Sequence, residues 1–168
     1  TSFNGYFYYQ NRTVLDGIYE TIQKVTATEE RPYFGYFHLW SPHEPYAPQS
    51  EFRKLFQDNL KTPTKPRHSL ADSPIREKEL RQYSRLYDQY VADVDAEFGI
   101  FMDAMDRFGL LDNTQVIVLS DHGQLFERGV HGHASRLMYD QGIHIPLLIS
   151  APGQTKRVDV YEPTGNVD

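Results

Sequence analysis

The stretch that decides the fold reads TQVIVLSDHG and occupies residues 114–123. Its first six residues are mostly apolar and β-branched, which is typical of a buried strand. An acidic side chain and an imidazole, Asp121 and His122, follow that strand almost directly. Because the carboxyl ends of parallel strands open onto the ligand crevice of an α/β sheet, these two residues are binding-site candidates, and Gly123 lets the chain turn without a side chain blocking the ligand. The alternative is a capping carboxylate beside an ordinary turn histidine.

Helices and apolar strands alternate in the rest of the chain. Apolar residues at steps of three and four predict helices at 14–27 and 76–108. An aromatic-rich run at 33–40 and an apolar run at 143–150 predict two further buried strands. Residues 46–74 are rich in Pro, Ser, Lys and Asp, which indicates a surface excursion. The alternation predicts a single α/β domain with a mostly parallel sheet flanked by helices.

Composition excludes several classes of function. The chain has 168 residues, 17 basic against 23 acidic, and a formal charge of −6 without a basic run, so a nucleic-acid partner is not expected. The absence of cysteine excludes disulfides, thiolate metal ligands and a cysteine nucleophile within these residues. No apolar run approaches the roughly 20 residues of a membrane helix, so no membrane segment is predicted in this chain.

Histidines gather after the predicted strands. His43 lies in SPHEPY, residues 41–46, where prolines hold the imidazole just beyond the strand at 33–40. Rigid placement of this kind is what a donor to an oxyanion requires. The alternative for His43 is a turn histidine bonded to nearby backbone. His131 and His133 are two residues apart on either side of Gly132, and in an extended segment two such imidazoles cannot easily both point at one ion, so one of the two is expected to face the site.

These residue types suggest a metal-assisted reaction on an anionic substrate. Asp121 and His122 offer a carboxylate oxygen and an imidazole nitrogen, which are suitable ligands for a divalent cation. Further imidazoles would contact the oxygens of the substrate. A nucleophile is not evident, because no Gly-x-Ser-x-Gly motif or comparable arrangement occurs in the sequence.

Five segments, in this order, resemble the sulfatases of the alkaline phosphatase superfamily. They are FHLWSPHEPY at 37–46, YVADVDAEFG at 90–99, LLDNT at 110–114, SDHG at 120–123 and IPLLI at 145–149. The resemblance runs from about residue 32 to residue 168 and is strongest between 90 and 153. It implies an incomplete alkaline-phosphatase-like core, in which residues 1–168 form the C-terminal portion of a sulfatase-type α/β catalytic domain.

The resemblance also implies roles for the candidate residues. Asp121 and His122 are similar to the metal-ligand pair of the family, whose usual divalent ion is calcium, with manganese and zinc as alternatives. His43 is similar to the histidine that hydrogen-bonds the sulfate or the leaving-group oxygen. His133 is the closest positional match to a lysine that many sulfatases carry near this point, with His131 as a competing assignment.

One departure from the family pattern concerns the nucleophile. Sulfatases carry a Cys or Ser in a Cys/Ser-x-Pro-x-Arg motif that is oxidised to formylglycine, and that motif is absent here. The Pro-x-Arg at 74–76 follows Asp72 and comes after the strand at 33–40, in the wrong order. We therefore expect a fragment of a sulfuric ester hydrolase whose nucleophile lies in the missing upstream part of the same domain. This chain alone is expected to hydrolyse nothing.

The expected substrate is a small-molecule or saccharide sulfate ester, and two other hypotheses remain open. The first stays within the superfamily and makes the parent protein a phosphodiesterase, a phosphonate hydrolase or a phosphotransferase. The second is a non-catalytic α/β module that binds a partner through the aromatic stretch 3–9 and the excursion at 46–74.

Overall fold

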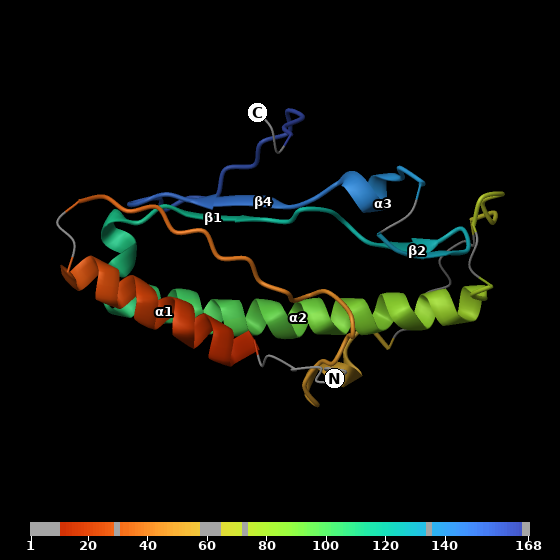
Figure 1. The fold of residues 1–168 in the computed structure, drawn as a ribbon, viewed down its shortest axis with the longest axis horizontal. Helices are drawn as coiled ribbons and strands as arrows, with labels where there is room; N and C mark the ends of the chain where they lie inside the picture. The colour runs from red at the N-terminus through yellow and green to blue at the C-terminus, as the bar shows by residue number, and fades with distance from the viewer. Residues whose placement is uncertain (1–10, 29–30, 58–64, 72–73, 134–135, 166–168) are drawn as a thin grey trace, which may run out of the picture.

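One long helix organises the molecule. The computed structural model describes residues 11–28, 31–57, 65–71, 74–133 and 136–165, so the aromatic stretch 3–9 and Asp72 lie outside the described residues. The elements in chain order are α1 (Asn11–Thr28), η1 (Phe52–Lys54), α2 (Glu77–Arg107), η2 (Leu110–Asn113), β1 (Val116–Leu119), β2 (Leu125–Glu127), β3 (Val130–Gly132), α3 (Asp140–Ile143) and β4 (Leu147–Ser150). Helix α2 runs along the long axis, with α1 beside one half of it (Figure 1). None of the described helices is both long and apolar enough to cross a bilayer.

Both predicted helices are confirmed, because each carries a continuous apolar stripe. Helix α1 packs against the C-terminal half of α2, where the rings of Tyr19 and Phe108 lie 5.9 Å apart. Leu15 and Ile22 of α1 are buried. Gly109 then ends α2 in the left-handed conformation with φ of 67°, which glycine adopts without steric cost.

Two polar side chains of α2, Asp93 and Gln89, are buried because they hydrogen-bond the segment at residues 49–55. Asp93 accepts hydrogen bonds from the backbone and side-chain nitrogens of Gln49, both at 2.8 Å. Gln89 donates to the carbonyls of Arg53 and Leu55 at 2.9 and 2.8 Å. These bonds satisfy the buried polar groups and fix the segment 49–55 on α2, so Asp93 is not part of a solvated face.

The sheet prediction needs correction. Strand β1 pairs with β4 in antiparallel register, with Val116 opposite Ser150 and Leu119 opposite Leu147. The second pair, β2 with β3, is also antiparallel, so the mostly parallel sheet is not formed by the described residues. A parallel neighbour needs a crossover connection that brings the chain back to the start of the first strand. Here the chain passes through the hairpin and α3 and enters β4 at the end where β1 stops, with Leu147 opposite Leu119.

The prediction of a buried strand at 33–40 is wrong for the described structure. The segment is assigned neither to a strand nor to a helix, and most of its aromatic side chains are exposed, Phe34 to 90%. Aromatic and β-branched content favours extended backbone, but a strand also needs a pairing partner, which local sequence cannot supply. Here no described strand pairs with the segment.

The β2–β3 hairpin was not predicted from the sequence. Its turn is the pair Arg128-Gly129, whose φ angles are 54° and 77°, as a type I′ turn requires. Leu125 and Val130 are buried, and β2 packs against α2. The hairpin carries the second group of candidate site residues back toward the end of β1.

Candidate active site

The loop that carries His43 is fixed to α2. The hydroxyl of Ser41 lies 2.9 Å from the hydroxyl of Tyr90, and the ring of Tyr46 packs edge-on against Tyr87 at 5.5 Å. The backbone N–H of His43 donates to the carbonyl of Trp40 at 2.9 Å, which closes the turn. Both peptide bonds to the prolines of residues 41–46 are cis. The predicted apolar stripe of the long helix therefore positions this loop through its tyrosines.

Three imidazoles from different segments meet beside this loop. The rings of His122 and His133 stack with centroids 3.9 Å apart and an interplanar angle of 18°. The ring of His43 stands edge-on to His133 at 5.2 Å. We call His43, His122 and His133 the histidine cluster. It joins the loop after residues 33–40, the end of β1 and the hairpin, which are far apart in the sequence.

The three rings share one hydrogen-bonding arrangement. His43 Nδ1 lies 2.7 Å from the carbonyl of Glu44, and His122 Nδ1 lies 2.8 Å from the carbonyl of Gly123. His133 Nδ1 lies 3.1 Å from the amide oxygen of Gln124. Since these oxygens only accept hydrogen bonds, each Nδ1 carries the proton and each Nε2 is left with a lone pair.

Asp121 and His122 together fit part of a metal site. His122 Nε2 lies 3.6 Å from Asp121 Oδ1, so both donor atoms face a common point. The bond from His122 Nδ1 to a backbone carbonyl is the support that metal-binding histidines usually have. Among the described residues no group of three or more His, Asp or Glu side chains is placed to hold a metal. The chain thus offers two ligands where calcium takes six to eight.

The carboxylate form of Asp121 is favoured by its surroundings. Burial acts to raise the pKa of Asp121, but His122 and the backbone N–H groups of Asp121 and His122 outweigh it, so the pKa lies below its ordinary value. The side chain is largely exposed. An ionised, accessible carboxylate at the end of β1 is suited to ligate a cation.

The pKa of His133 is lowered. Burial is the first cause, and the neighbouring rings of His122 and His43 add to it because each disfavours further positive charge. Asp121 and Glu44 oppose the shift without reversing it. An anion entering the histidine cluster would relieve this mutual repulsion, so the cluster is suited to receive negatively charged oxygens.

His131 and His133 have different neighbours, although residues two apart in a regular strand share one face. Strand β3 ends at Gly132, whose φ of 107° turns the chain between the two histidines. His131 packs against Tyr83 at 4.3 Å and against Phe126 at 5.6 Å, in the aromatic layer on α2. Its Nε2 lies 3.7 Å from Glu44 Oε2, beyond hydrogen-bond range. His133, and not His131, is the histidine that joins the histidine cluster. The sequence alone left the choice between these two residues open.

Gly123 makes a close backbone contact that the sequence did not indicate. A Cβ atom at this position would come within 2.1 Å of the carbonyl oxygen of Gln141. The backbone N–H of Gly123 donates to the carbonyl of Gly142 at 2.9 Å. Gly123 is therefore needed for close packing against α3.

Two residues near the cluster were missed in the sequence. Gln124 bridges His133 and the hydroxyl of Tyr46, to which its amide nitrogen donates at 2.8 Å. Trp40 packs against the ring of His43 with centroids 4.4 Å apart. Tyr46 and Trp40 belong to the quoted motif at 37–46, but nothing local in the sequence indicates their partners.

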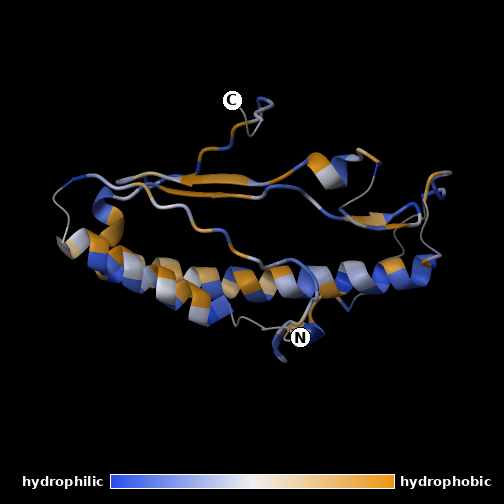
Figure 2. Ribbon diagram, in the orientation of Figure 1, coloured by the Kyte–Doolittle hydropathy of each residue, from blue (hydrophilic) through white to orange (hydrophobic). Residues whose placement is uncertain are grey.

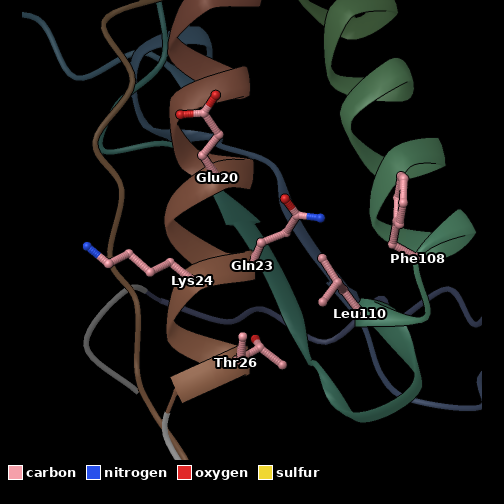
Figure 3. Close-up of a pocket in the computed structure, with 7 residues that line it drawn as sticks. Glu20, Gln23, Lys24, Thr26, Phe108 and Leu110 are labelled. Carbon is pink, nitrogen blue, oxygen red and sulfur yellow. The ribbon is translucent and has the colours of Figure 1, made fainter.

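A separate open hollow lies between the C-terminal turns of α1 and the end of α2 (Figure 3). Glu20, Gln23 and Lys24 line it from α1, with Phe108 and Leu110 on the other side. No histidine lines it, and it does not include the candidate residues. The site is therefore defined by the side chains at the end of β1 and not by this hollow.

Comparisons with known proteins relate the chain to sulfatases. The family model described as Sulfatase matches residues 1–168. The chain is 24% identical to the choline-sulfatase of Rhizobium meliloti (strain 1021) over 169 residues, which cover 90% of this chain and 32% of that protein. It is 27% identical to the ulvan-active sulfatase of Formosa agariphila over 150 residues, 84% of this chain and 28% of that protein.

A solved structure shares the fold. The crystal structure of Ps i-CgsB in complex with k-i-k-neocarrahexaose superposes with a TM-score of 0.56 at 19% sequence identity, and the match covers 86% of this chain and 28% of that chain. The chain thus spans about a third of the length of the curated relatives it matches.

Proposed function

The chain belongs to the sulfatase family, and on that basis we propose that the protein hydrolyses sulfate esters at the histidine cluster and Asp121. Its fold is that of the alkaline-phosphatase-like sulfatases. The observation that carries the proposal is the stacking of His122 on His133 at 3.9 Å, with His43 5.2 Å from His133. This arrangement brings three imidazole rings together, and the ring of His122 lies beside the carboxylate of Asp121.

Asp121 and His122 are proposed as metal ligands. Members of this family generally use a divalent metal. Calcium is our first choice and manganese or zinc the alternatives. A bound cation would offset negative charge on the sulfate oxygens. Asp121 supplies an ionised oxygen, and His122 supplies an Nε2 lone pair whose direction is fixed by the bond from Nδ1 to a backbone carbonyl.

His43 and His133 are proposed to act on the ester itself. Each holds a proton on Nδ1, so uptake of a second proton at Nε2 makes that atom a donor. An anionic sulfate oxygen favours the protonated form, and a protonated ring can hydrogen-bond a sulfate oxygen or give its proton to the leaving oxygen as the S–O bond breaks. Their rings are close enough to serve one substrate group.

The remaining machinery is proposed to come from outside this chain. We propose that residues 1–168 are the C-terminal portion of the catalytic domain and that the nucleophile and further metal ligands belong to its upstream part. The exposed apolar strands β1 and β4 and the unpaired aromatic segment 33–40 support this proposal, since more strands, in mostly parallel order, would cover them. The chain alone is then inactive.

The substrate is proposed to be a small-molecule or saccharide sulfate ester. Two of the relatives are a choline-sulfatase and an ulvan-active sulfatase, and the solved structure that shares the fold was determined in complex with k-i-k-neocarrahexaose. The match to sulfatases favours sulfate over the phosphodiester, phosphonate and phosphotransfer alternatives. The family match also favours an enzyme over a binding module.

The test compares ester types on the full-length protein. Purified protein with added Ca²⁺ is assayed with 4-nitrophenyl sulfate and bis(4-nitrophenyl) phosphate, and release of inorganic sulfate is measured from choline sulfate and from a sulfated oligosaccharide. We expect turnover of sulfate esters, loss of it with a chelator, and none with residues 1–168 alone. Turnover of the phosphodiester without any sulfate ester would contradict the proposal.

A further inference from the structure

The side chain of Gln124 joins two parts of the site that are far apart in sequence. Its amide nitrogen donates to the hydroxyl of Tyr46 at 2.8 Å, and its amide oxygen lies 3.1 Å from His133 Nδ1. Tyr46 belongs to the loop that carries His43, whereas His133 follows the hairpin. Both contacts are partly buried. One amide therefore spans the space between the two segments that deliver the proposed substrate-contacting histidines.

The contact with His133 determines which ring nitrogen carries the proton. An amide oxygen accepts hydrogen bonds and cannot donate one, so the proton lies on Nδ1 and the Nε2 atom of His133 remains available. His43 and His122 also carry the proton on Nδ1, but their acceptors are backbone carbonyls. A side-chain substitution does not remove a backbone carbonyl. His133 alone in the cluster depends on another side chain for this arrangement.

The contact with Tyr46 determines where the amide itself lies. The ring of Tyr46 is held among Tyr87, Tyr90 and Phe126, with centroid distances of 5.5, 6.5 and 6.1 Å. Burial and the nearby charge of Glu44 raise the pKa of Tyr46, so its hydroxyl stays neutral and can accept the amide N–H. Because an amide has one donor end and one acceptor end, this bond directs the oxygen of Gln124 toward His133.

We propose that Gln124 is a positioning residue, which sets the ring tautomer of His133 and aligns it with the loop of His43. Support of this kind from outside the reacting groups typically changes activity about 10- to 100-fold. The expected change in turnover rests on the proposed sulfatase function. The expected tautomer of His133 is independent of that function.

Three variants of the full-length protein separate positioning from simple stability. Gln124→Leu removes both bonds, whereas Gln124→Glu keeps an acceptor for His133 and can accept from the Tyr46 hydroxyl. Gln23→Leu is the matched control, because Gln23 Nε2 donates to the Tyr19 hydroxyl at 2.7 Å in a partly buried contact on α1, away from the cluster. Each protein is labelled with ¹⁵N-histidine, and the ring signal of His133 is assigned with a His133→Gln variant.

The first measurement is a long-range ¹H–¹⁵N correlation spectrum near pH 8, where the ring is neutral, recorded without substrate. We expect the Nδ1–H form of His133 in the wild type, in Gln124→Glu and in the Gln23→Leu control, and a mixture of both tautomers in Gln124→Leu. An unchanged His133 signal in a folded Gln124→Leu protein would overturn the inference, as would a wild type that carries the proton on Nε2.

The second measurement is steady-state turnover of 4-nitrophenyl sulfate. We expect Gln124→Leu to lower kcat about 10- to 100-fold with KM little changed, Gln124→Glu to recover most of it, and the control to match the wild type. Equal losses in Gln124→Leu and Gln124→Glu would overturn the inference. A wild type without any turnover would reject the proposed function, while the spectrum still decides the tautomer.

Discussion

The hairpin end of the molecule and the β1–β4 pair differ in how fully this chain packs them. At the hairpin end, Leu80, Leu125 and Val130 are buried, and the loops are tied to α2 by hydrogen bonds. In the other region, β4 is exposed along its whole length. Both of its strands are strongly apolar, as Figure 2 shows. Apolar strands gain stability only when covered, so the second region lacks a covering partner among the described residues.

The difference indicates which parts of the candidate site this chain can assemble by itself. The contacts that assemble the histidine cluster come from α2, the loop 41–46, the turn after β1 and the hairpin, all within the described residues. The sheet beneath Asp121, in contrast, has only two strands in the part of the chain that the structure describes. We therefore expect the arrangement of the imidazoles to be intrinsic to this chain and the metal shell to depend on other parts of the domain.

Asp121 lies where the two regions meet, and its removal should have the largest effect. In the full-length protein Asp121→Asn keeps the shape of the side chain but removes the charge that ligates the cation. We expect turnover of 4-nitrophenyl sulfate to fall more than about 100-fold, since even supporting residues around a metal cost 10- to 100-fold. Metal content measured by mass spectrometry should fall in parallel. Asp103→Asn, on the exposed face of α2, is the control, and equal activity of the two variants would refute the assignment.

A pair of leucine substitutions tests the packing difference itself. Leu80 is 0% exposed and Leu148 is 62% exposed. In residues 1–168 we expect Leu80→Ala to lower the free energy of unfolding by about 2–5 kcal/mol and Leu148→Ala by less than about 0.5 kcal/mol. Urea unfolding measures both values. In the full-length protein the cost of Leu148→Ala should rise if the sheet is covered there, and an unchanged cost would argue against a covering partner.

Gly123 tests the close contact between the end of β1 and α3. A Cβ atom would meet backbone and not a movable side chain, so Gly123→Ala should destabilise the chain by about 1–3 kcal/mol. Gly99→Ala is the control, because nothing lies within 4 Å of a Cβ built at Gly99 in α2. That control should be neutral or up to about 1 kcal/mol more stable, as alanine favours helices. Similar thermal unfolding of both variants would show that the contact can relax freely.

The smallest expected effect is the pH dependence that comes from His133. Its pKa is lowered in the folded protein, so on acidification the unfolded chain takes up this proton first. Stability should therefore decrease as the pH falls below about 6.5, the value for a free histidine, toward the lower folded pKa. We expect the melting temperature of His133→Phe to vary less between about pH 7 and pH 5 than that of the wild type. A steeper dependence in the variant would contradict the direction of the shift.

The helices could be predicted because their signal is local. Periodic apolar residues gave 14–27 and 76–108 against observed helices at Asn11–Thr28 and Glu77–Arg107. The strand predicted at 33–40 and the predicted parallel order are not found among the described residues, since strand pairing depends on segments remote in sequence. The Arg128-Gly129 turn did carry a weak local signal, a glycine between the apolar pair Leu125-Phe126 and Val130.

Part of the candidate site could also be predicted. The residue types after β1 and in the loop 41–46 indicated Asp121, His122 and His43, and only one of the two hairpin histidines was expected to face them. The choice of His133 over His131 depended on the hairpin register and on the aromatic contacts of His131. The bridge through Gln124 joins residues 78 positions apart, so no local pattern could reveal it.

The most direct test of the account is a crystal structure of the full-length protein grown with Ca²⁺ and inorganic sulfate. The account predicts a cation bound by Asp121 and His122, and a sulfate whose oxygens lie within hydrogen-bond distance of the Nε2 atoms of His43 and His133. A cation and a sulfate bound elsewhere, with these four side chains contacting neither, would contradict it.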